Sequence, residues 1–148
     1  MRFVVRCFRL EGMDARTLRE PRRAGAEGLL VQTVREGLGS NELLFEMLAA
    51  QTFSNRDSGT LLTRKPEVDL LLRIAGTTQI SAAMSRVGTM KGMPFVLIVA
   101  GTRKQVERFE LGLGGAGARL ERRSLSDGEL AMVEDAALLD VVGSRRRV

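Results

Sequence analysis

The residue types that could support catalysis are sparse in this chain. Histidine is absent from its 148 residues, which removes the commonest metal ligand and the commonest general base near neutral pH. A serine or cysteine nucleophile would need a lysine or a carboxylate as its base, and none of the few lysines lies in a recognisable motif. The sequence therefore predicts a protein without catalytic residues, metal ligands or a bound cofactor.

Three glycines match a nucleotide-binding pattern, although the segments around them do not. Gly112, Gly114 and Gly117 are spaced as G-x-G-x-x-G, but the dinucleotide fingerprint requires a strand before them and a long helix after them. Here a charged helical segment precedes the glycines and an arginine-rich segment follows. We therefore interpret them as a glycine-rich turn.

The carboxylates form no acid/base pair that the sequence can identify. They are expected on outer faces or first turns of amphipathic helices, where solvated carboxylates are usual. The residues concerned are Glu42, Glu46, Glu67, Asp69, Glu129 and Glu134.

Positive charge is the strongest compositional signal. The net charge is +5 and the basic residues are mostly arginine, which suits bidentate contacts to phosphate. Four pairs of adjacent cations favour a nucleic-acid partner. These pairs are Arg22–Arg23, Arg64–Lys65, Arg103–Lys104 and Arg122–Arg123. With six phenylalanines and neither tyrosine nor tryptophan, an aromatic base-stacking platform is not expected.

A helical hairpin is predicted over residues 66–87, with Gly76 between its two helices. Pro66 suits the first turn of a helix, and Gly76 can take the left-handed conformation that ends one, after which Thr77 can cap the next. Each helix has apolar residues at i, i+3, i+4 and i+7. These are Val68, Leu71, Leu72 and Ala75 in the first helix, and Ile80, Ala83, Met84 and Val87 in the second.

The hairpin has an alternative interpretation as a DNA-reading helix-turn-helix. Gln79, Ser81, Ser85 and Arg86 would then lie on the recognition helix. Only Gly76 and Thr77 separate the two apolar stripes, which is shorter than the usual turn of three or four residues. We keep this function as the alternative.

The segment over residues 61–92, LLTRKPEVDLLLRIAGTTQISAAMSRVGTMKG, resembles the signature of the small kinase-binding subunit of the KEOPS complex, the archaeal-type TPRKB-like family. That signature has an Ala/Thr-Arg/Lys-Lys-x-x-Glu entry, an apolar helix, Gly-Thr-x-Gln-Ile, and a second helix ending in Val-Gly or Ile-Gly. Weaker similarity extends from the first predicted strand to PFVLIVAG. Family members often have a basic residue where this chain has Thr78.

The resemblance implies a non-catalytic α/β subunit that binds the kinase-like ATPase of KEOPS and delivers tRNA, gripped by its 3′ CCA end, for threonylcarbamoyl-adenosine synthesis. We expect tRNA contacts near the ends and outer face of the hairpin, from Arg64, Lys65, Arg73, Gly76, Thr77, Thr78 and Gln79. We expect the protein partner to contact Ile80, Met84 and Val87, although each of these taken alone fits a buried core position better. No small-molecule substrate and no membrane partner are expected.

The predicted elements form an α/β fold: a small mixed sheet packed with helices. Strands are expected at 2–10, 28–33, 60–63, 94–101 and 118–123, and helices at 14–19, 41–54, 66–87, 103–110 and from 126 onward. Inward positions are expected at Phe3, Val5 and Cys7 in the first strand, Leu43, Leu44, Met47, Leu48 and Gln51 in the second helix, and Leu130, Val133 and Ala137 in the last.

The length predicts one compact domain over residues 1–143, followed by a disordered basic tail at 144–148. No apolar run approaches the roughly 20 residues of a membrane-spanning helix. The lone Cys7 cannot form an internal disulfide, in agreement with a reducing compartment. A cytoplasmic location is expected.

Overall fold

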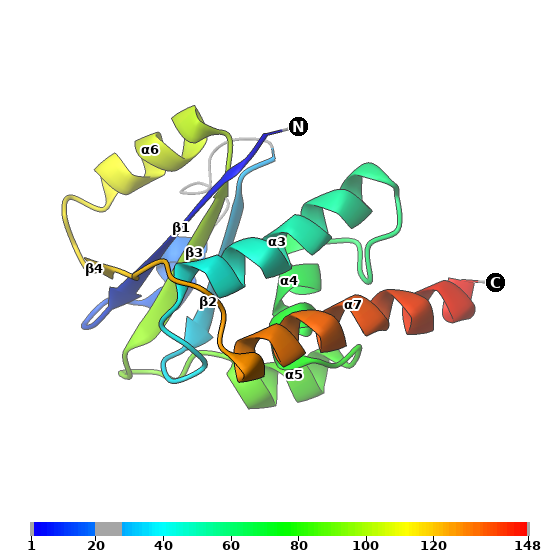
Figure 1. Cartoon of the computed structure of the whole chain (residues 1–148). Coiled ribbons are helices and arrows are strands. Elements are labelled where there is room, and N and C mark those ends of the chain that lie inside the picture. Colours follow the sequence, from blue (N-terminus) through cyan, green and yellow to red (C-terminus); the bar gives the residue numbers. More distant parts are fainter. Residues whose placement is uncertain (1, 20–27, 148) are drawn as a thin grey trace.

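A computed structural model describes residues 2–19 and 28–147 of the chain, with side chains described as far as position 141 (Figure 1). Pro21, which was expected to end the helix predicted at 14–19, and the Arg22–Arg23 pair lie outside the described residues. Within the described ranges, no helix is both long enough and apolar enough to cross a bilayer.

The described strands form one four-stranded sheet in the order β2-β3-β1-β4. The strands are β1 (Val4–Leu10), β2 (Leu30–Arg35), β3 (Phe95–Gly101) and β4 (Ala118–Arg119). All three pairings are antiparallel, so the expectation of a mixed sheet was wrong. Every residue of β3 is buried, which confirms the strand predicted at 94–101 and reflects its cover of helices on both faces.

Six helices within the described residues pack on the two faces of this sheet, confirming the α/β class (Figure 1). They are α1 (Ala15–Arg19), α3 (Glu42–Asp57), α4 (Pro66–Ala75), α5 (Ile80–Val87), α6 (Arg103–Gly112) and α7 (Asp127–Arg147). Helices α3, α4, α5 and α7 share one hydrophobic core with one sheet face, and α1 and α6 share a second core with the other. The hairpin predicted at 66–87 is present as α4 and α5.

Alternation along β1 supplies both cores; only the inward face of Phe3, Val5 and Cys7 was predicted. Val5 and Cys7 enter the core beneath α3, while Phe8 and Leu10 enter the core beneath α6. The Cys7 thiol is fully buried, and burial, together with the nearby charge of Glu42, raises its pKa well above the ordinary value. Because the thiol stays protonated at neutral pH, Cys7 acts as a small core residue rather than as a nucleophile.

Side chains cap the starts of four helices, α1, α3, α6 and α7. Asp14 accepts hydrogen bonds from Arg16 N and Thr17 Oγ1 at the start of α1, and Asn41 accepts from Leu43 N at the start of α3. Reciprocal capping boxes begin α6, between Thr102 and Gln105, and α7, between Ser126 and Glu129. These side chains satisfy N–H groups that have no partner within the helix.

Several predicted boundaries were wrong. Strand β2 is shifted to Leu30–Arg35, and residues 60–63 form no strand. Strand β4 has only two of the six predicted residues, because Glu121 turns away from β1 and pairs with Asn41 and Glu42 N at the start of α3. The backbone of α7 continues through Arg147, so helix includes most of the segment expected to form a tail.

Two helices are rotated relative to the predicted inward faces. In α3 the two phenylalanines Phe45 and Phe53 are buried, while Met47 is 37% exposed and Gln51 is partly exposed. In α7 Val133 and Ala136 are buried, whereas Leu130 and Ala137 are exposed. In α7, hydrogen bonds determine which side faces inward, because the carbonyls of Val133 and Ala136 accept hydrogen bonds from Gln51 and Arg73.

We expect the glycine motif to be structural, which two alanine substitutions test. Gly117 has φ +82°, and an added Cβ would overlap Leu10 Cδ2 and lie 2.9 Å from Arg9 O. Gly117→Ala should therefore lower the free energy of unfolding by about 2–4 kcal/mol. Gly112→Ala is the matched control, because its Cβ would meet nothing within 4 Å at the end of α6; it should raise stability by about 0.5 kcal/mol. Urea unfolding followed by circular dichroism measures both, and equal effects would contradict the prediction.

Candidate nucleic-acid interface

The hairpin turn is built around Gly76, as predicted. Gly76 has φ 70° and ψ 34°, the left-handed conformation that ends a helix, and its N–H and that of Thr77 both donate to Leu72 O. The N-cap of α5 is Gln79 rather than the predicted Thr77. Thr77 instead accepts a hydrogen bond from Gln79 N through its hydroxyl, at 3.1 Å, which fixes the shape of the turn.

Helix α4 is buried on more sides than its apolar stripe predicted. All residues from 69 to 74 are buried, including the charged Asp69 and Arg73. The predicted stripe members Val68 and Ala75 are only partly buried. The helix packs against β2, α3, α5 and α7. The central residues of α4 therefore have no exposed face that could contact RNA.

Asp69 and Arg73, one turn apart on α4, form a buried ion pair. Arg73 Nε lies 2.6 Å from Asp69 Oδ1, and both side chains are fully buried. The Asp69 carboxylate also accepts from Thr52 Oγ1 at 2.6 Å and from Leu62 N at 2.9 Å. The placement of Asp69 on a solvated face was therefore wrong.

The Arg73 guanidinium connects α4 to α3 and α7. Its Nη1 donates to Gln51 Oε1 on α3, and to Ala136 O and Asp140 Oδ2 on α7. Its Nη2 donates to Asp140 Oδ1 at 2.8 Å. Burial acts to lower the pKa of Arg73, but its hydrogen bonds to Asp140 and Asp69 outweigh burial and raise the pKa. Arg73 is thus a permanent internal cation, and its predicted contact with tRNA was wrong.

The remaining predicted RNA contacts lie at the two ends of α4. Arg64 and Lys65 are exposed before its first turn, and neither has an ion-pair partner in the described part of the chain. Gly76 and Gln79 are exposed beyond its last turn, with Thr77 and Thr78 partly buried between them. The 10 residues of α4 separate the two groups by about 15 Å. The structure therefore presents a basic pair and a polar turn, rather than one cluster.

Of the three predicted contacts with a protein partner on helix α5, two are exposed and one is buried. Ile80 and Met84 are 53% and 45% exposed, one turn apart on its outer surface. Val87 is 2% exposed and packs in the core with Ala83, so its assignment as a partner contact was wrong. Arg86 Nη1 donates to Ala75 O, and Arg35 donates to Ser85 O and Gly88 O. These bonds tie the C-terminal end of α5 to β2 and to the end of α4.

Glu42 is a second carboxylate whose predicted position on a solvated surface was wrong. It is 2% exposed and accepts hydrogen bonds from Cys7 N and from Arg119. The favourable contact with Glu42 raises the pKa of Arg119. The hydrogen bonds of Glu42 join α3 to β1 and β4, so the burial of this carboxylate has a structural explanation.

The geometry argues against a dinucleotide site at the glycine motif, but it removes one argument against a helix-turn-helix at the hairpin. Helix α6 precedes the glycine motif and the two-residue β4 follows it, the reverse of the strand and helix that a dinucleotide site needs. Four residues, 76–79, connect α4 to α5. Turn length therefore no longer argues against a helix-turn-helix.

Comparison with known proteins adds no identification: no family model matches the chain, and no curated protein matches it. Within the described ranges, no group of three or more acidic or cysteine side chains is arranged to hold a metal ion. The exposed ends of the hairpin are the candidate site on the strength of their own geometry.

We expect Arg73 to have a structural role as the buried partner of Asp69, not to contact a ligand. Arg73→Met leaves Asp69 buried without its cation and should lower the free energy of unfolding by about 3–5 kcal/mol. Adding Asp69→Asn should recover part of that loss, because it removes the unpaired charge. Arg64→Met, on the same hairpin but exposed, should change stability by less than about 0.5 kcal/mol. Urea unfolding measures all three variants, and a loss below about 1 kcal/mol for Arg73→Met would contradict the assignment.

Proposed function

We propose that this protein is a non-catalytic, cytoplasmic subunit of a KEOPS-type tRNA-modification complex, in which it binds the kinase-like ATPase and recruits tRNA by its 3′ CCA end. The observation that carries the proposal is the exposed pair Arg64–Lys65 and the exposed turn 76–79 at opposite ends of one buried helix. These are the segments in which the sequence resembles the TPRKB-like signature.

The two exposed groups offer complementary contacts to RNA. Arg64 and Lys65 provide charge for phosphates. The first N–H groups of α5 have no acceptor within the helix and favour an anion at its N-terminus, beside the Thr77 and Thr78 hydroxyls. Since about 15 Å separates the two groups, a ligand that contacts both must be extended, as a single-stranded 3′ end is.

The rigid base beneath these groups supports recognition. Arg73 and Asp69 fix α4 against α3 and α7, and Gly76 sets the angle of the turn. Polar groups held in one arrangement lose little conformational freedom on binding. The network therefore contributes to binding by positioning the turn, without touching the ligand.

The protein partner in this proposal docks on α5. Ile80 and Met84 present apolar surface next to the turn, and such residues are typical anchors when a helix packs against a partner. This places the ATPase contact beside the RNA contact on the same hairpin.

A helix-turn-helix protein is the second candidate, favoured by the four-residue connection between α4 and α5. It would prefer particular duplex DNA sequences as a dimer. Capture from an extract of the native host separates the two candidates: recovery of tRNA and a kinase-like ATPase supports the KEOPS proposal, and recovery of duplex DNA supports the alternative.

Neutralising the basic pair should weaken tRNA binding. With Arg64→Gln and Lys65→Gln, we expect roughly tenfold lower affinity at low salt, and a slope of log K against log salt that is smaller by about 1.4, because two single-strand phosphate contacts are lost. Fluorescence anisotropy with labelled tRNA measures both. Arg103→Gln with Lys104→Gln on α6 is the control with the same charge change and should have little effect; equal effects would show that binding follows net charge alone.

Changing the outer surface of α5 should disrupt the protein complex. Ile80→Asp with Met84→Asp should reduce affinity for the purified kinase-like ATPase by at least about tenfold, because both side chains would lose apolar contact. Leu111→Asp on α6, where Leu111 is 82% exposed, is the matched control and should bind normally. Calorimetric titration measures the affinities, and unchanged binding by the α5 variant would exclude this surface.

A further inference from the structure

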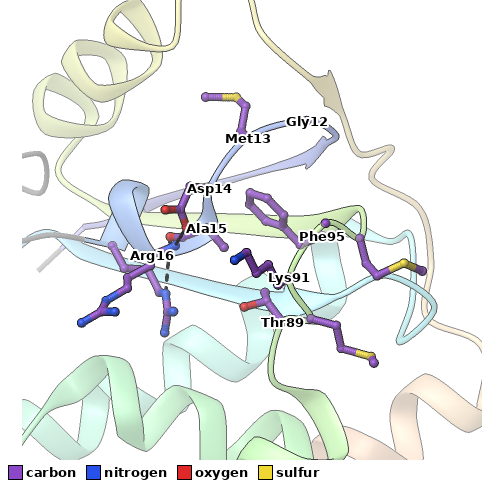
Figure 2. A pocket seen from close by; sticks show the side chains of 12 residues that line it. Gly12, Met13, Asp14, Ala15, Arg16, Thr89, Lys91 and Phe95 are labelled. Atoms are coloured by element: carbon purple, nitrogen blue, oxygen red, sulfur yellow. Dashed lines mark hydrogen bonds between the residues drawn. The ribbon is translucent and has the colours of Figure 1, made fainter.

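A cavity of about 670 Å³ lies between α1 and the loop that joins α5 to β3 (Figure 2). Residues 12–16 and Arg19 line one side, residues 89–93 line the other, and Phe95 adds its ring at the start of β3. None of these residues belongs to the proposed RNA or ATPase surfaces. The volume is in the range of small-molecule sites.

The lining of this cavity is cationic. Among the described lining residues, Arg16, Arg19 and Lys91 are cationic, and Asp14 supplies one carboxylate. Both Asp14 oxygens already accept hydrogen bonds, from Arg16 N at 2.9 Å and Thr17 Oγ1 at 3.2 Å, as the cap of α1. The carboxylate is thus occupied by local structure, and the net charge around the cavity favours an anion.

Two of the cations have no described partner. Neither Arg16 nor Lys91 forms an ion pair with any residue in the ranges 2–19 and 28–141. Figure 2 shows Lys91 extending from its loop toward α1, where Asp14 and Arg16 lie. Cationic residues therefore line the cavity on both the α1 side and the loop side.

The other part of the lining is apolar. Met90 and Met93 are 56% and 57% exposed and separate this cavity from a neighbouring hollow of about 410 Å³, which they also line. The two charged residues of that hollow have partners: Arg35 binds the carbonyls of Ser85 and Gly88, and Glu36 binds Arg9. Methionine side chains adapt readily to flat apolar ligands.

We propose that this cavity binds a small organic phosphate with a flat, largely apolar body, of the mononucleotide class. The phosphate lies between Arg16 and Lys91, since charge-assisted hydrogen bonds to phosphate need cationic donors. The ring system lies against Met90 and Met93, which are the exposed apolar residues of the lining. The ligand is a bound effector, and no bond is made or broken.

Titration of the full chain with AMP, adenosine and inorganic phosphate tests the proposal, by calorimetry at low salt. AMP should bind with a dissociation constant below about 1 mM, and at least tenfold more tightly than adenosine or phosphate alone, because each of these keeps only one half of the contacts. Failure of AMP to bind below that concentration, or equal affinity for phosphate, would overturn the proposal.

Three variants locate the site. Arg16→Gln with Lys91→Gln should weaken AMP binding at least tenfold, whereas Arg103→Gln with Lys104→Gln, which carries the same charge change on α6, should not. Arg64→Gln with Lys65→Gln must also leave AMP binding intact, because AMP resembles the terminal nucleotide of a tRNA 3′ end. Loss of AMP binding in that last variant, or its persistence in the first, would assign AMP to another surface and overturn the proposal.

Discussion

The guanidinium of Arg73 is the interaction on which the arrangement of the helical layer depends. It lies fully buried between three helices, and all three of its nitrogens donate to oxygens of Asp69, Asp140, Gln51 or Ala136. A planar group whose donors are all used allows only one relative placement of α3, α4 and α7. Replacing such a pair by apolar residues can leave stability unchanged, so we infer that its main contribution is to fix geometry.

This fixed geometry explains how a hairpin with little exposed surface can present a binding site. Helix α4 is covered along its length, and only its two ends and the outer side of α5 reach solvent. The charged pair before α4 and the polar turn after it are therefore held a fixed distance apart by a rigid element. A site of this kind discriminates ligands by length as well as by charge, because a compact anion can contact the groups at only one end of α4.

The sequence predicted local features well and long-range polar contacts poorly. The central strand β3, the helix end at Gly76 and the caps at Asn41 and Ser126 follow from residues that are adjacent or nearly so. Asp69 and Arg73 were misplaced because burial of a charge depends on partners such as Thr52, Gln51 and Asp140, which come from distant segments. Their spacing of four residues was the available signal, since an Asp–Arg pair at that spacing can neutralise itself. The rotated faces of α3 and α7 were missed because large side chains and buried carbonyls, rather than apolar spacing alone, decide which side of a helix faces inward.

The place of β1 in the sheet also determines the order in which the chain can fold. Strand β1 lies between β3 and β4, and its register joins Val4 to Gly101 and Phe8 to Arg119. Both neighbours are synthesised long after β1, so during translation its apolar residues have no partner strand of the described sheet until the β3 and β4 segments have left the ribosome. Loops of this length close slowly. We therefore expect helix pairs such as α4 and α5 to form first, and the sheet to close last around its earliest strand.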